Sequence, residues 1–466
     1  MNHTYSTLRT ALVPLALALV LAGCASSTIV DISQVPAAPT AFKEGVTAVS
    51  STTANPQVQG LWWTAFADPV LDSLITKANG NNSSIQVAAG RLAQARAIAG
   101  QLDANRYPQA SIGAGATRQL NATTGNVAQT VVSAGANLSY EVDLFGKLSG
   151  ASNAASLDAA SREALLRSTQ LLVQADVAQT YLSLRALDAE RELVRSTLQA
   201  YQNTVHLTEV RLREGDVAEL EVARVRSEAA STESEALALD QRRAVLEHAL
   251  AVLVGEVASN FAIAPTTWAT ALPVIPAGVP STVLTRRPDI AAAQNTLQAA
   301  QARVGVAKAA WFPTFSLTAN GGYAASEVQD LFKLSTQAWG VGALLSLPIF
   351  DGGRREAGLQ GANAELNIAL ANYREQVLVA FRDVEDQLAA LRLLADQSDA
   401  QSRSVASSSR ATVLSGSRYR NGFVSQLELL DAQRSELRNR RQALQVKAAQ
   451  YSATVGLIRA LGGGWV

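Results

Sequence analysis

Two acidic residues near the end of the chain are the clearest candidates for chemistry. Glu428 and Asp431 stand three positions apart, and residues at i and i+3 share one face of a helix. Neighbouring carboxylates attract cations, and they repel each other unless one is protonated or bound to a counter-ion. A second explanation stays open, because carboxylates near the N-terminus of a helix are also stabilised by its dipole.

The usual signatures of catalysis and metal binding are missing from the sequence. The three histidines, His3, His206 and His248, have no metal-ligand partner at a useful spacing, and the chain has a single cysteine. No Walker motif occurs, and Gly113-Ala114-Gly115 belongs to an expected strand rather than a nucleotide-binding loop. The 39 basic and 39 acidic side chains cancel, which argues against nucleic acid as the main partner. We therefore expect a protein that is not an enzyme and has no metal site and no cofactor.

The N-terminus is typical of a secretory signal. Arg9 supplies positive charge, residues 11–21 form an apolar run too short to span a bilayer, and Leu21-Ala22-Gly23-Cys24 follows. Small residues before a cysteine resemble a bacterial lipobox, so we expect residues 1–23 to be removed and Cys24 to carry a covalent lipid. The alternative is ordinary cleavage beside an incidental cysteine. In bacterial lipoproteins, which this N-terminus resembles, a residue other than Asp after the cysteine implies retention in the outer membrane, and Ala25 fits that practice. Residues 24–60, rich in small residues, are expected to form an extended tether.

The rest of the chain repeats itself at an offset of 207 residues. Gln94-Ala95-Arg96 recurs as Gln301-Ala302-Arg303. Gly215 recurs as Gly422, and Glu221 recurs as Glu428. We expect two duplicated regions, 61–255 and 288–466, joined by a linker over 256–287.

Each repeat is expected to contain the same elements in the same order. A helix comes first, then a pair of strands, then a helix of roughly 100 Å, a glycine turn and a shorter helix. The expected helices cover 82–105, 146–212 and 217–253 in the first repeat and 288–310, 352–419 and 424–460 in the second. Apolar residues of 352–419 recur at alternating spacings of three and four, from Leu366 to Leu391, which predicts a coiled-coil seam. A bundle or tube can bury such helices, whereas a globular core cannot.

The strands are expected to have one apolar and one polar face. Apolar and polar residues alternate over 107–118, 130–144, 312–323 and 339–350, and we place Leu347 and Ile349 on the apolar face of the last strand. Aromatic residues gather near the strand ends, as in the two girdles of an outer-membrane barrel. They are Tyr107, Tyr140, Trp311 and Phe312 at one end and Tyr323 and Trp339 at the other. The alternative is a soluble sandwich whose apolar faces pack together.

Four strands cannot close a barrel alone, and open edges in lipid leave backbone groups unpaired. If the strands lie in a membrane, the chain must therefore form oligomers. Two chains give eight strands with an interior filled by side chains, and three give twelve with room for a water-filled lumen. The sequence also leaves four chains open.

Several motifs are distributed in a fixed order over essentially the whole mature chain. They are Leu21-Ala22-Gly23-Cys24, Trp62-Trp63, Asp68-Pro69, Arg286-Arg287-Pro288-Asp289-Ile290, Trp311-Phe312-Pro313, Leu347-Pro348-Ile349-Phe350-Asp351-Gly352-Gly353, Tyr419-Arg420-Asn421-Gly422, Leu430-Asp431-Ala432-Gln433-Arg434 and Ala460-Leu461-Gly462-Gly463-Gly464-Trp465. In this order they resemble the TolC-like outer-membrane efflux protein family, and more closely its NodT-type lipoprotein branch.

The resemblance implies an α+β membrane protein with a two-fold internal repeat. It implies a trimer with a twelve-stranded β-barrel, four strands per chain, and a long periplasmic α-helical barrel. A mixed α/β equatorial belt would be built from the N-terminal, middle (254–287) and C-terminal segments. The family implies a lipid-anchored protein of the bacterial outer membrane that extends into the periplasm.

The function implied is that of a passive outer-membrane channel in a tripartite efflux pump that exports drugs or other toxic small molecules. Its partners would be two further copies of the chain, a periplasmic adaptor protein, an inner-membrane pump of the resistance–nodulation–division class and outer-membrane lipid. The alternatives are a duct for metal-ion efflux, a duct for type I protein secretion, and a periplasmic spacer without a pore.

The resemblance also implies roles for individual residues. Asp431, Glu428, Glu221 and Tyr419 match positions of the family's periplasmic gate, where three copies of Glu428 and Asp431 would place six carboxylates around one axis. Val424 stands where the family's best-known member has an arginine, so the gate must be held by other bonds. Arg213, Arg420 and Arg434 are the arginines that we consider for them.

Two short turns are expected to form the periplasmic tip that contacts the adaptor. The contact residues implied are Glu214, Gly215, Asp216, Asn421, Gly422 and Phe423. A structural role alone is the alternative for the two glycines, since glycine ends helices in a left-handed conformation. We interpret the motifs Arg286-Arg287-Pro288-Asp289 and Gly462-Gly463-Gly464 as structural.

Overall fold

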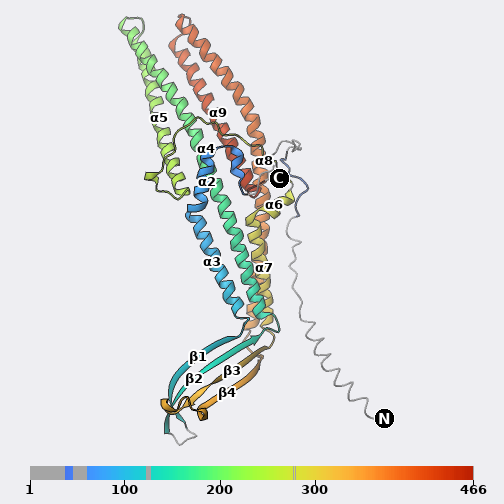
Figure 1. Cartoon of the computed structure of the whole chain (residues 1–466). Coiled ribbons are helices and arrows are strands. Elements are labelled where there is room, and N and C mark those ends of the chain that lie inside the picture. Colours follow the sequence, from blue (N-terminus) through green and yellow to red (C-terminus); the bar gives the residue numbers. More distant parts are fainter. Residues whose placement is uncertain (1–36, 46–59, 122–126, 277, 279, 465–466) are drawn as a thin grey trace. The chain divides into compact units, whose positions relative to one another are not determined.

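The computed structural model describes residues 37–45, 60–121, 127–276, 278 and 280–464. They form two compact units (Figure 1). The described part of the first, the sheet unit, is Arg91–Glu163, without 122–126, and Ala292–Glu375. That of the second, the helical unit, is 37–45, 60–90, 164–291 and 376–464, without 277 and 279. The predicted signal, the lipidation site Cys24 and Trp465 lie outside the described residues.

The sheet unit is built on one antiparallel sheet of four strands in the order β1-β2-β3-β4. The strands are β1 (Gln109–Asn121), β2 (Val127–Val142), β3 (Thr314–Ala325) and β4 (Gln337–Ser346). Their register aligns the apolar residues: Ala110 pairs with Leu138, Leu138 with Ala319, and Ala319 with Val341. Since paired residues point to the same side of a sheet, one face is apolar across all four strands. The predicted two-faced strands are confirmed.

The polar face carries Ser111, Asn137 and Asn320, which also align across the strands. Gly135 and Gly322 form a cross-strand pair on this face. A Cβ added to Gly322 would lie 2.4 Å from the carbonyl oxygen of Ala134. The two strands therefore approach too closely for any side chain at this pair.

The last strand is shorter than predicted. β4 ends at Ser346, so the placement of Leu347 and Ile349 on its apolar face is wrong. Pro348 follows Leu347 and has no N–H to donate to a strand ladder. The chain then turns through Gly352 and Gly353, which both have positive φ angles, into the next helix.

Four helical segments complete the sheet unit. They belong to α3 (Ser83–Ala104), α4 (Lys147–Arg213), α7 (Pro288–Ala309) and α8 (Arg354–Arg420). The start of α4 packs on α7, because Ser161 Oγ donates to the Ala292 carbonyl oxygen (3.0 Å) and Arg303 forms an ion pair with Asp158. Asp351 accepts bonds from the N–H groups of Gly353 (3.1 Å) and Arg355 (3.2 Å), so this motif residue caps α8.

The repeat extends to the bounds of the long helices. The offset of 207 residues maps α4 onto α8, and it maps α5 (Glu219–Leu253) onto α9 (Gln426–Ala460), at both ends of each helix. Thus the predicted two-fold internal repeat is confirmed. In the helical unit, α4 with α5 and α8 with α9 form two hairpins, as Figure 1 shows.

The core of the helical unit joins segments from three parts of the chain. The N-terminal part contributes η2 (Trp62–Phe66) and α2 (Pro69–Asn81), and the linker contributes η4 (Ala258–Asn260) and α6 (Pro280–Arg286). The Tyr451 ring of α9 lies 4.9 Å from the ring of Trp268 in the linker and 6.3 Å from that of Phe66. These contacts join the N-terminal, middle and C-terminal segments from which the resemblance builds the belt. Within the described residues these segments form helices and irregular backbone but no strand, so the expected α/β mixture is not observed there.

Asp68 explains the motif Asp68-Pro69. Its carboxylate caps α2 by accepting from the N–H groups of Val70 (3.0 Å) and Leu71 (3.3 Å). The same carboxylate accepts from the Tyr181 hydroxyl (2.8 Å) and the Thr270 hydroxyl (2.9 Å), which fastens the N-terminal helix to α4 and the linker. Within the residues that the structure describes, no helix combines the length and the apolar character needed to cross a lipid bilayer.

Candidate functional site at the helical tips

The turn between α4 and α5 is set by one backbone motif. Gly215 has a φ of +80°. Its N–H donates to the Leu212 carbonyl (3.0 Å), and the Asp216 N–H donates to the Arg211 carbonyl (2.8 Å). These two bonds form a Schellman motif, which satisfies the last carbonyls of a helix and reverses the chain.

The turn between α8 and α9 repeats this motif. Gly422 has a φ of +76°, and its N–H donates to the Tyr419 carbonyl (3.0 Å). The Phe423 N–H donates to the Arg418 carbonyl (2.9 Å). No atom lies within 4 Å of a Cβ added at Gly215 or Gly422, so the backbone angle and not crowding requires glycine there. The structural role that we left open for the two glycines is therefore present.

The six predicted adaptor-contact residues lie at these two turns and are exposed. They are Glu214, Gly215, Asp216, Asn421, Gly422 and Phe423. The Phe423 side chain is 74% exposed, which is unusual for a large apolar residue that has a helix to pack on. Their contact with an adaptor stays a prediction.

Tyr419 connects the two hairpins. Its hydroxyl accepts a hydrogen bond from Arg211 Nη1 (2.9 Å), and the guanidinium lies 5.8 Å from the centre of the tyrosine ring. A second link is formed by Gln426 of α9, whose amide donates to the Thr208 hydroxyl (3.1 Å) of α4. The structure thus gives Tyr419 a bridging position, with an arginine that the sequence analysis did not consider.

Arg434 also connects the two hairpins. Its Nε donates to Glu228 Oε2 of α5 (2.7 Å), its Nη2 bonds the same oxygen, and its Nη1 lies 3.3 Å from Asp431. Of the three arginines considered for the gate, Arg434 is the one that the structure pairs. Arg213 and Arg420 make no ion pair within the described part of the chain.

The pairs between α5 and α9 follow a heptad spacing. Seven residues beyond the Glu228–Arg434 pair, Arg441 Nη1 donates to Glu235 Oε2 (3.0 Å), and Arg441 Nε donates to Glu190 of α4 (2.7 Å). Glutamates at 221, 228 and 235 and arginines at 434 and 441 are visible in the sequence. This spacing of opposite charges on two helices is the signal that could have revealed the pairs.

Glu221 occupies the next place towards the tip, where this series is incomplete. Seven residues before Arg434, α9 carries Leu427 and not an arginine. Glu221 Oε1 lies 3.8 Å from Arg224, and its buried Oε2 has no hydrogen-bond partner among the described residues. A buried carboxylate oxygen without a donor is costly, by about 1–3 kcal/mol or more.

The two other predicted gate carboxylates are exposed and weakly paired. Glu428 lies 3.7 Å from Arg418, and Asp431 lies 3.3 Å from Arg434. The backbone N–H of Glu428 donates to the Ser425 hydroxyl (3.4 Å), which caps α9. Glu428 therefore lies in the first turn of α9, where the helix dipole stabilises a carboxylate. This agrees with the alternative explanation that the sequence analysis left open for this residue. Their place around a common axis stays a prediction.

The tip helices enclose a tyrosine that is buried away from water. Tyr201 of α4 is 1% exposed and packs with Val225 and Leu430. Burial raises its pKa to about 12, and the neighbouring Glu228 carboxylate adds to that shift. The hydroxyl therefore stays protonated at any physiological pH and does not act as a base.

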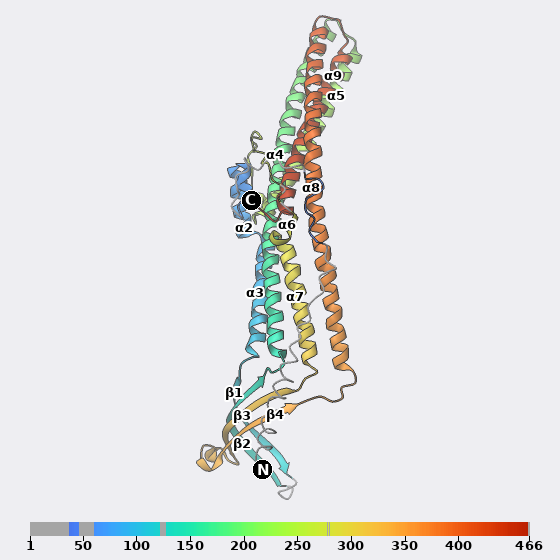
Figure 2. The same cartoon turned by 90° about the vertical axis from the view of Figure 1, so that its right-hand side faces the viewer.

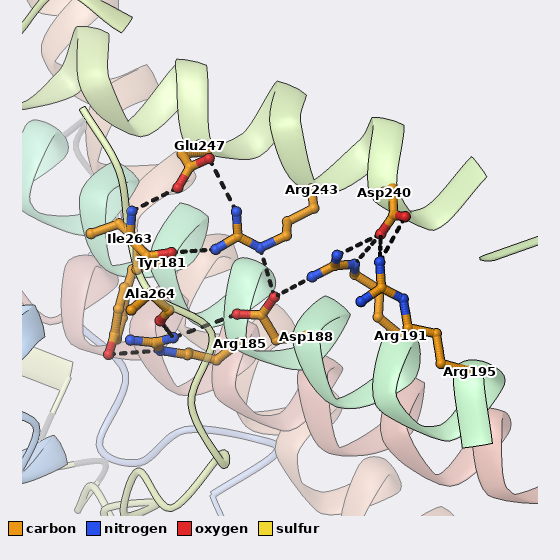
Figure 3. Close-up of polar contacts among 10 residues, drawn as sticks. All are labelled: Tyr181, Arg185, Asp188, Arg191, Arg195, Asp240, Arg243, Glu247, Ile263 and Ala264. Atoms are coloured by element: carbon orange, nitrogen blue, oxygen red, sulfur yellow. Dashed lines mark hydrogen bonds and ion pairs between the residues drawn. The ribbon is translucent and has the colours of Figure 1, made fainter. Parts of the chain in front are cut away.

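A buried network of arginines and carboxylates lies on α4 and α5, farther from the tips (Figure 3). Asp188 is its centre, because it accepts from Arg191 Nη1 (3.2 Å) and Arg243 Nε (2.8 Å) and pairs with Arg185 (3.5 Å). Asp240 accepts from Arg191 and Arg195 (2.7 and 2.8 Å). Burial raises the pKa of Asp240, but the hydrogen bonds from these two arginines outweigh it, so the pKa is lowered overall.

This network holds the linker rather than a ligand. Arg185 Nη1 donates to the Ala264 carbonyl (2.8 Å), and Arg243 Nη2 donates to the Ile263 carbonyl. Glu247 accepts from the Ile263 N–H (2.6 Å), as Figure 3 shows. The arginines and carboxylates are thus occupied by one another and by backbone, which is a structural arrangement.

Arg287 has the same kind of role in the motif Arg286-Arg287-Pro288-Asp289. Its buried guanidinium bonds Asp289 (2.7 Å), Asp383 of α8 (3.3 Å) and the Ala460 carbonyl at the end of α9 (3.2 Å). Our structural interpretation of the motif agrees with these contacts. Among the described residues, no three His, Cys, Asp or Glu side chains are grouped so that they could hold a metal ion.

A two-faced sheet joined to paired long-helix hairpins is the architecture of an outer-membrane efflux protein. The family model "Outer membrane efflux protein" matches residues 74–256 and 279–463, once in each repeat. The chain belongs to this family, and it is an efflux protein of the outer membrane and not an enzyme.

Individual relatives cover nearly the whole chain. The cation efflux system protein CusC of Escherichia coli O6:H1 is 33% identical, over 97% of this chain and 98% of its own length. The toluene efflux pump outer membrane protein TtgF of Pseudomonas putida is 34% identical, over 87% of this chain and 85% of its own length. The probable outer membrane lipoprotein SilC of Salmonella typhimurium is 31% identical, over 96% of this chain and 97% of its own length.

The fold is similar to solved structures of outer-membrane proteins. The structure of VceC from Vibrio cholerae superposes with a TM-score of 0.82 at 30% identity, covering 88% of this chain and all (100%) of that chain. The predicted family, fold class and outer-membrane location are thereby confirmed.

Proposed function

We propose that three copies of this chain form a passive outer-membrane channel with a twelve-stranded barrel. The observation that carries the proposal is the sheet: β1 and β4 each pair on one side only within the described residues, and one face is apolar over all four strands. In lipid such edges leave backbone groups unpaired, so other copies must pair with them. Three copies give the smallest closed barrel with room for water.

The polar face of the sheet would then line the lumen. Ser111, Asn137 and Asn320 on that face are small and uncharged, and the Gly135–Gly322 pair adds no side chain to it. Such a lining transmits solutes without selecting them strongly. Selection and energy would therefore come from the partners, an inner-membrane pump and a periplasmic adaptor.

Attachment to the membrane would be reinforced by a lipid on Cys24. Cys24 lies outside the described residues, as do most residues of the tether, and the support is the lipobox-like sequence together with the similarity to SilC, a probable lipoprotein. The tips formed by Gly215 and Gly422 would meet the adaptor, and Glu428, Asp431, Glu221 and Tyr419 would surround the closed periplasmic end.

The barrel can be tested by joining neighbouring subunits through their edges. Ala110 of β1 and Leu345 of β4 lie near the same end of the sheet and on its apolar face. Cysteines at both positions should form disulfides between subunits and give a ladder of dimers and trimers on denaturing gels. Leu120→Cys with Leu345→Cys is the matched control, because Leu120 lies on the same face as Ala110 but at the opposite end of β1. A ladder that is equally strong in the control, or that is absent in all membrane preparations, would contradict the proposal.

A conductance measurement tests the pore itself. Purified protein in planar bilayers should show channels whose conductance rises when Glu428 and Asp431 are replaced by Gln and Asn. Stable protein that never conducts, even with both substitutions, would favour the periplasmic spacer instead.

For the cargo, we propose small toxic organic compounds. The similarity to TtgF, a toluene efflux pump protein, supports this class. The chain has one methionine and one cysteine in all, so it offers few of the sulfur ligands that soft metal ions prefer.

Metal ions are the second candidate cargo, favoured by the 33% identity to the cation efflux protein CusC. Deletion of the gene, followed by growth with graded organic solvents, antibiotics, copper or silver, separates the two. Sensitivity to the metals alone would replace our proposal by metal-ion efflux.

A further inference from the structure

The connection between β3 and β4, residues 326–336, is an ordered element and not a loose loop. It contains η5 (Val328–Asp330) and η6 (Leu334–Thr336). The Thr336 hydroxyl bonds the carbonyls of Leu331 (2.8 Å) and Lys333 (2.7 Å), and Lys333 forms an ion pair with Asp330. Leu331 is buried beneath it.

This connection nevertheless exposes its large apolar side chains. Val328 is 72% exposed, Phe332 75% and Leu334 84%. A polar connection would suffice to join two strands in water. Three exposed apolar residues on a fixed scaffold therefore indicate a surface that meets something apolar.

One contact shows on which side of the sheet this surface lies. The Phe332 ring packs edge-on against the Tyr323 ring, with 5.6 Å between their centres. Tyr323 of β3 pairs with Ala134, and it alternates with Gly322 of the polar face. Tyr323 therefore belongs to the apolar face, and Phe332 lies over that face. In Figure 2 the connection projects to the side of the sheet.

We propose that the β3–β4 connection is a lipid-binding element that inserts Phe332 and Leu334 into the outer leaflet around the channel. The inference rests on the membrane orientation in our proposed function, in which the apolar face contacts lipid. The exposed apolar residues of the β3–β4 connection continue the apolar face of the sheet at the end where Trp339 of β4 is also exposed. A lid over the channel mouth would instead cover the polar face, and the Tyr323–Phe332 contact places the ring on the other side.

Depth-dependent fluorescence quenching tests this placement. Cysteine is introduced at Phe332, at Gln329 of the same connection, or at Val341 on the apolar face of β4, and is labelled with bimane. The unsubstituted chain, whose only cysteine is Cys24, gives the background. Trimers are reconstituted into phosphatidylcholine vesicles with acyl chains brominated near the headgroup, and iodide serves as the aqueous quencher.

The label at 332 should lose most of its emission to brominated lipid and be shielded from iodide, whereas the label at 329 should show the reverse. Iodide quenching at 332 equal to that at 329 would overturn the inference, as would a label quenched by neither, which would indicate a lid or a subunit contact. If either of these results is obtained at position 332 while brominated lipid still quenches the label at 341, only the lipid-binding role of the connection is refuted, and the proposed channel is not. A label at 341 that lipid does not quench would overturn the membrane orientation and this inference together.

A conductance measurement separates the lipid contact from a lid by a second route. Phe332→Ser and Leu334→Ser should leave single-channel conductance unchanged while weakening the retention of brominated lipid near the label at 341. An increased conductance in either variant would show that the connection obstructs the mouth, which contradicts the proposal.

Discussion

The Glu228–Arg434 pair should hold the two hairpins of one subunit together in the closed channel. We consider Arg434→Met, which keeps an unbranched apolar stem but removes the guanidinium with its charge and its hydrogen bonds. Glu228 is then left without a cation, with its side chain 17% exposed. If opening separates α5 from α9, the closed state loses this contact and the open state loses nothing.

The expected magnitude follows from the geometry of the pair. Exposed ion pairs contribute about 0.2–1 kcal/mol, and hydrogen bonds to charged groups contribute about 1.5–3 kcal/mol. Arg434 is 41% exposed and Glu228 much less, so a value of about 1 kcal/mol per subunit is a conservative choice. Three subunits that open together would lose about 3 kcal/mol, which is roughly a hundredfold shift towards the open state.

Open probability in planar bilayers measures this shift, and vancomycin uptake by cells measures it in the envelope. Arg438→Met is the matched control, because Arg438 lies one turn further along α9, is exposed and makes no ion pair within the described residues. Glu228→Gln should have a similar effect to Arg434→Met, and the double substitution should add little. An open probability that is the same for the variants at 434 and 438, or fully additive effects at 228 and 434, would refute the role of the pair.

Three further outcomes follow from single residues. Arg287→Met should destabilise the helical unit by about 3–5 kcal/mol, seen as a lower midpoint of thermal unfolding, whereas Arg286→Met should change it little. Gly215→Ala should cost about 1–2 kcal/mol because of its positive φ and speed hydrogen exchange at the turn. In contrast, Gly361→Ala inside α8, with nothing within 4 Å of the added Cβ, should stabilise by about 0.5–1 kcal/mol. Because the pKa of Asp240 is lowered in the folded state, its ionised carboxylate stabilises the fold at pH values above the unfolded-state pKa of about 3.9. This contribution is lost as the pH falls through the pKa of the folded state. Asp240→Asn should therefore reduce the loss of stability measured between pH 5 and pH 2, and an unchanged pH profile would contradict it.

The long helices were predictable because their signals are local and repeated. The apolar seam from Leu366 to Leu391 and the glycines at 215 and 422 specify period and end points without reference to the rest of the chain. The predicted bounds of α4 and α8 differ from those observed by one or two residues. The strand pattern likewise predicted the apolar face, because alternation alone determines which residues share a side.

Contacts between segments that are distant in the sequence were harder to predict from the sequence. Arg211 and Arg287 differ from exposed charges only in what the fold places beside them, and a single residue carries no sign of that neighbour. The end of β4 shows the same limit on a smaller scale. Leu347 and Ile349 continue the apolar alternation, but the missing N–H of Pro348 prevents the backbone pairing that makes a strand.

The two repeats have the same backbone elements, but they differ in the side-chain bonds that hold each hairpin. The offset places Ala395 where α4 has Asp188, and Lys447 where α5 has Asp240, so the α8–α9 hairpin lacks the buried arginine network. Lys447 instead lies 4.2 Å from the centre of the Trp268 ring. The α4–α5 hairpin is therefore tied to the linker by a network that is expensive to break. Apart from the Arg287 contacts at the base of the hairpin, α8 and α9 are held to α4 and α5 by Arg211, Arg434 and Arg441, through bonds that are partly exposed to solvent. If one hairpin moves when the periplasmic end opens, these contacts favour movement of α8 and α9 against a fixed α4 and α5.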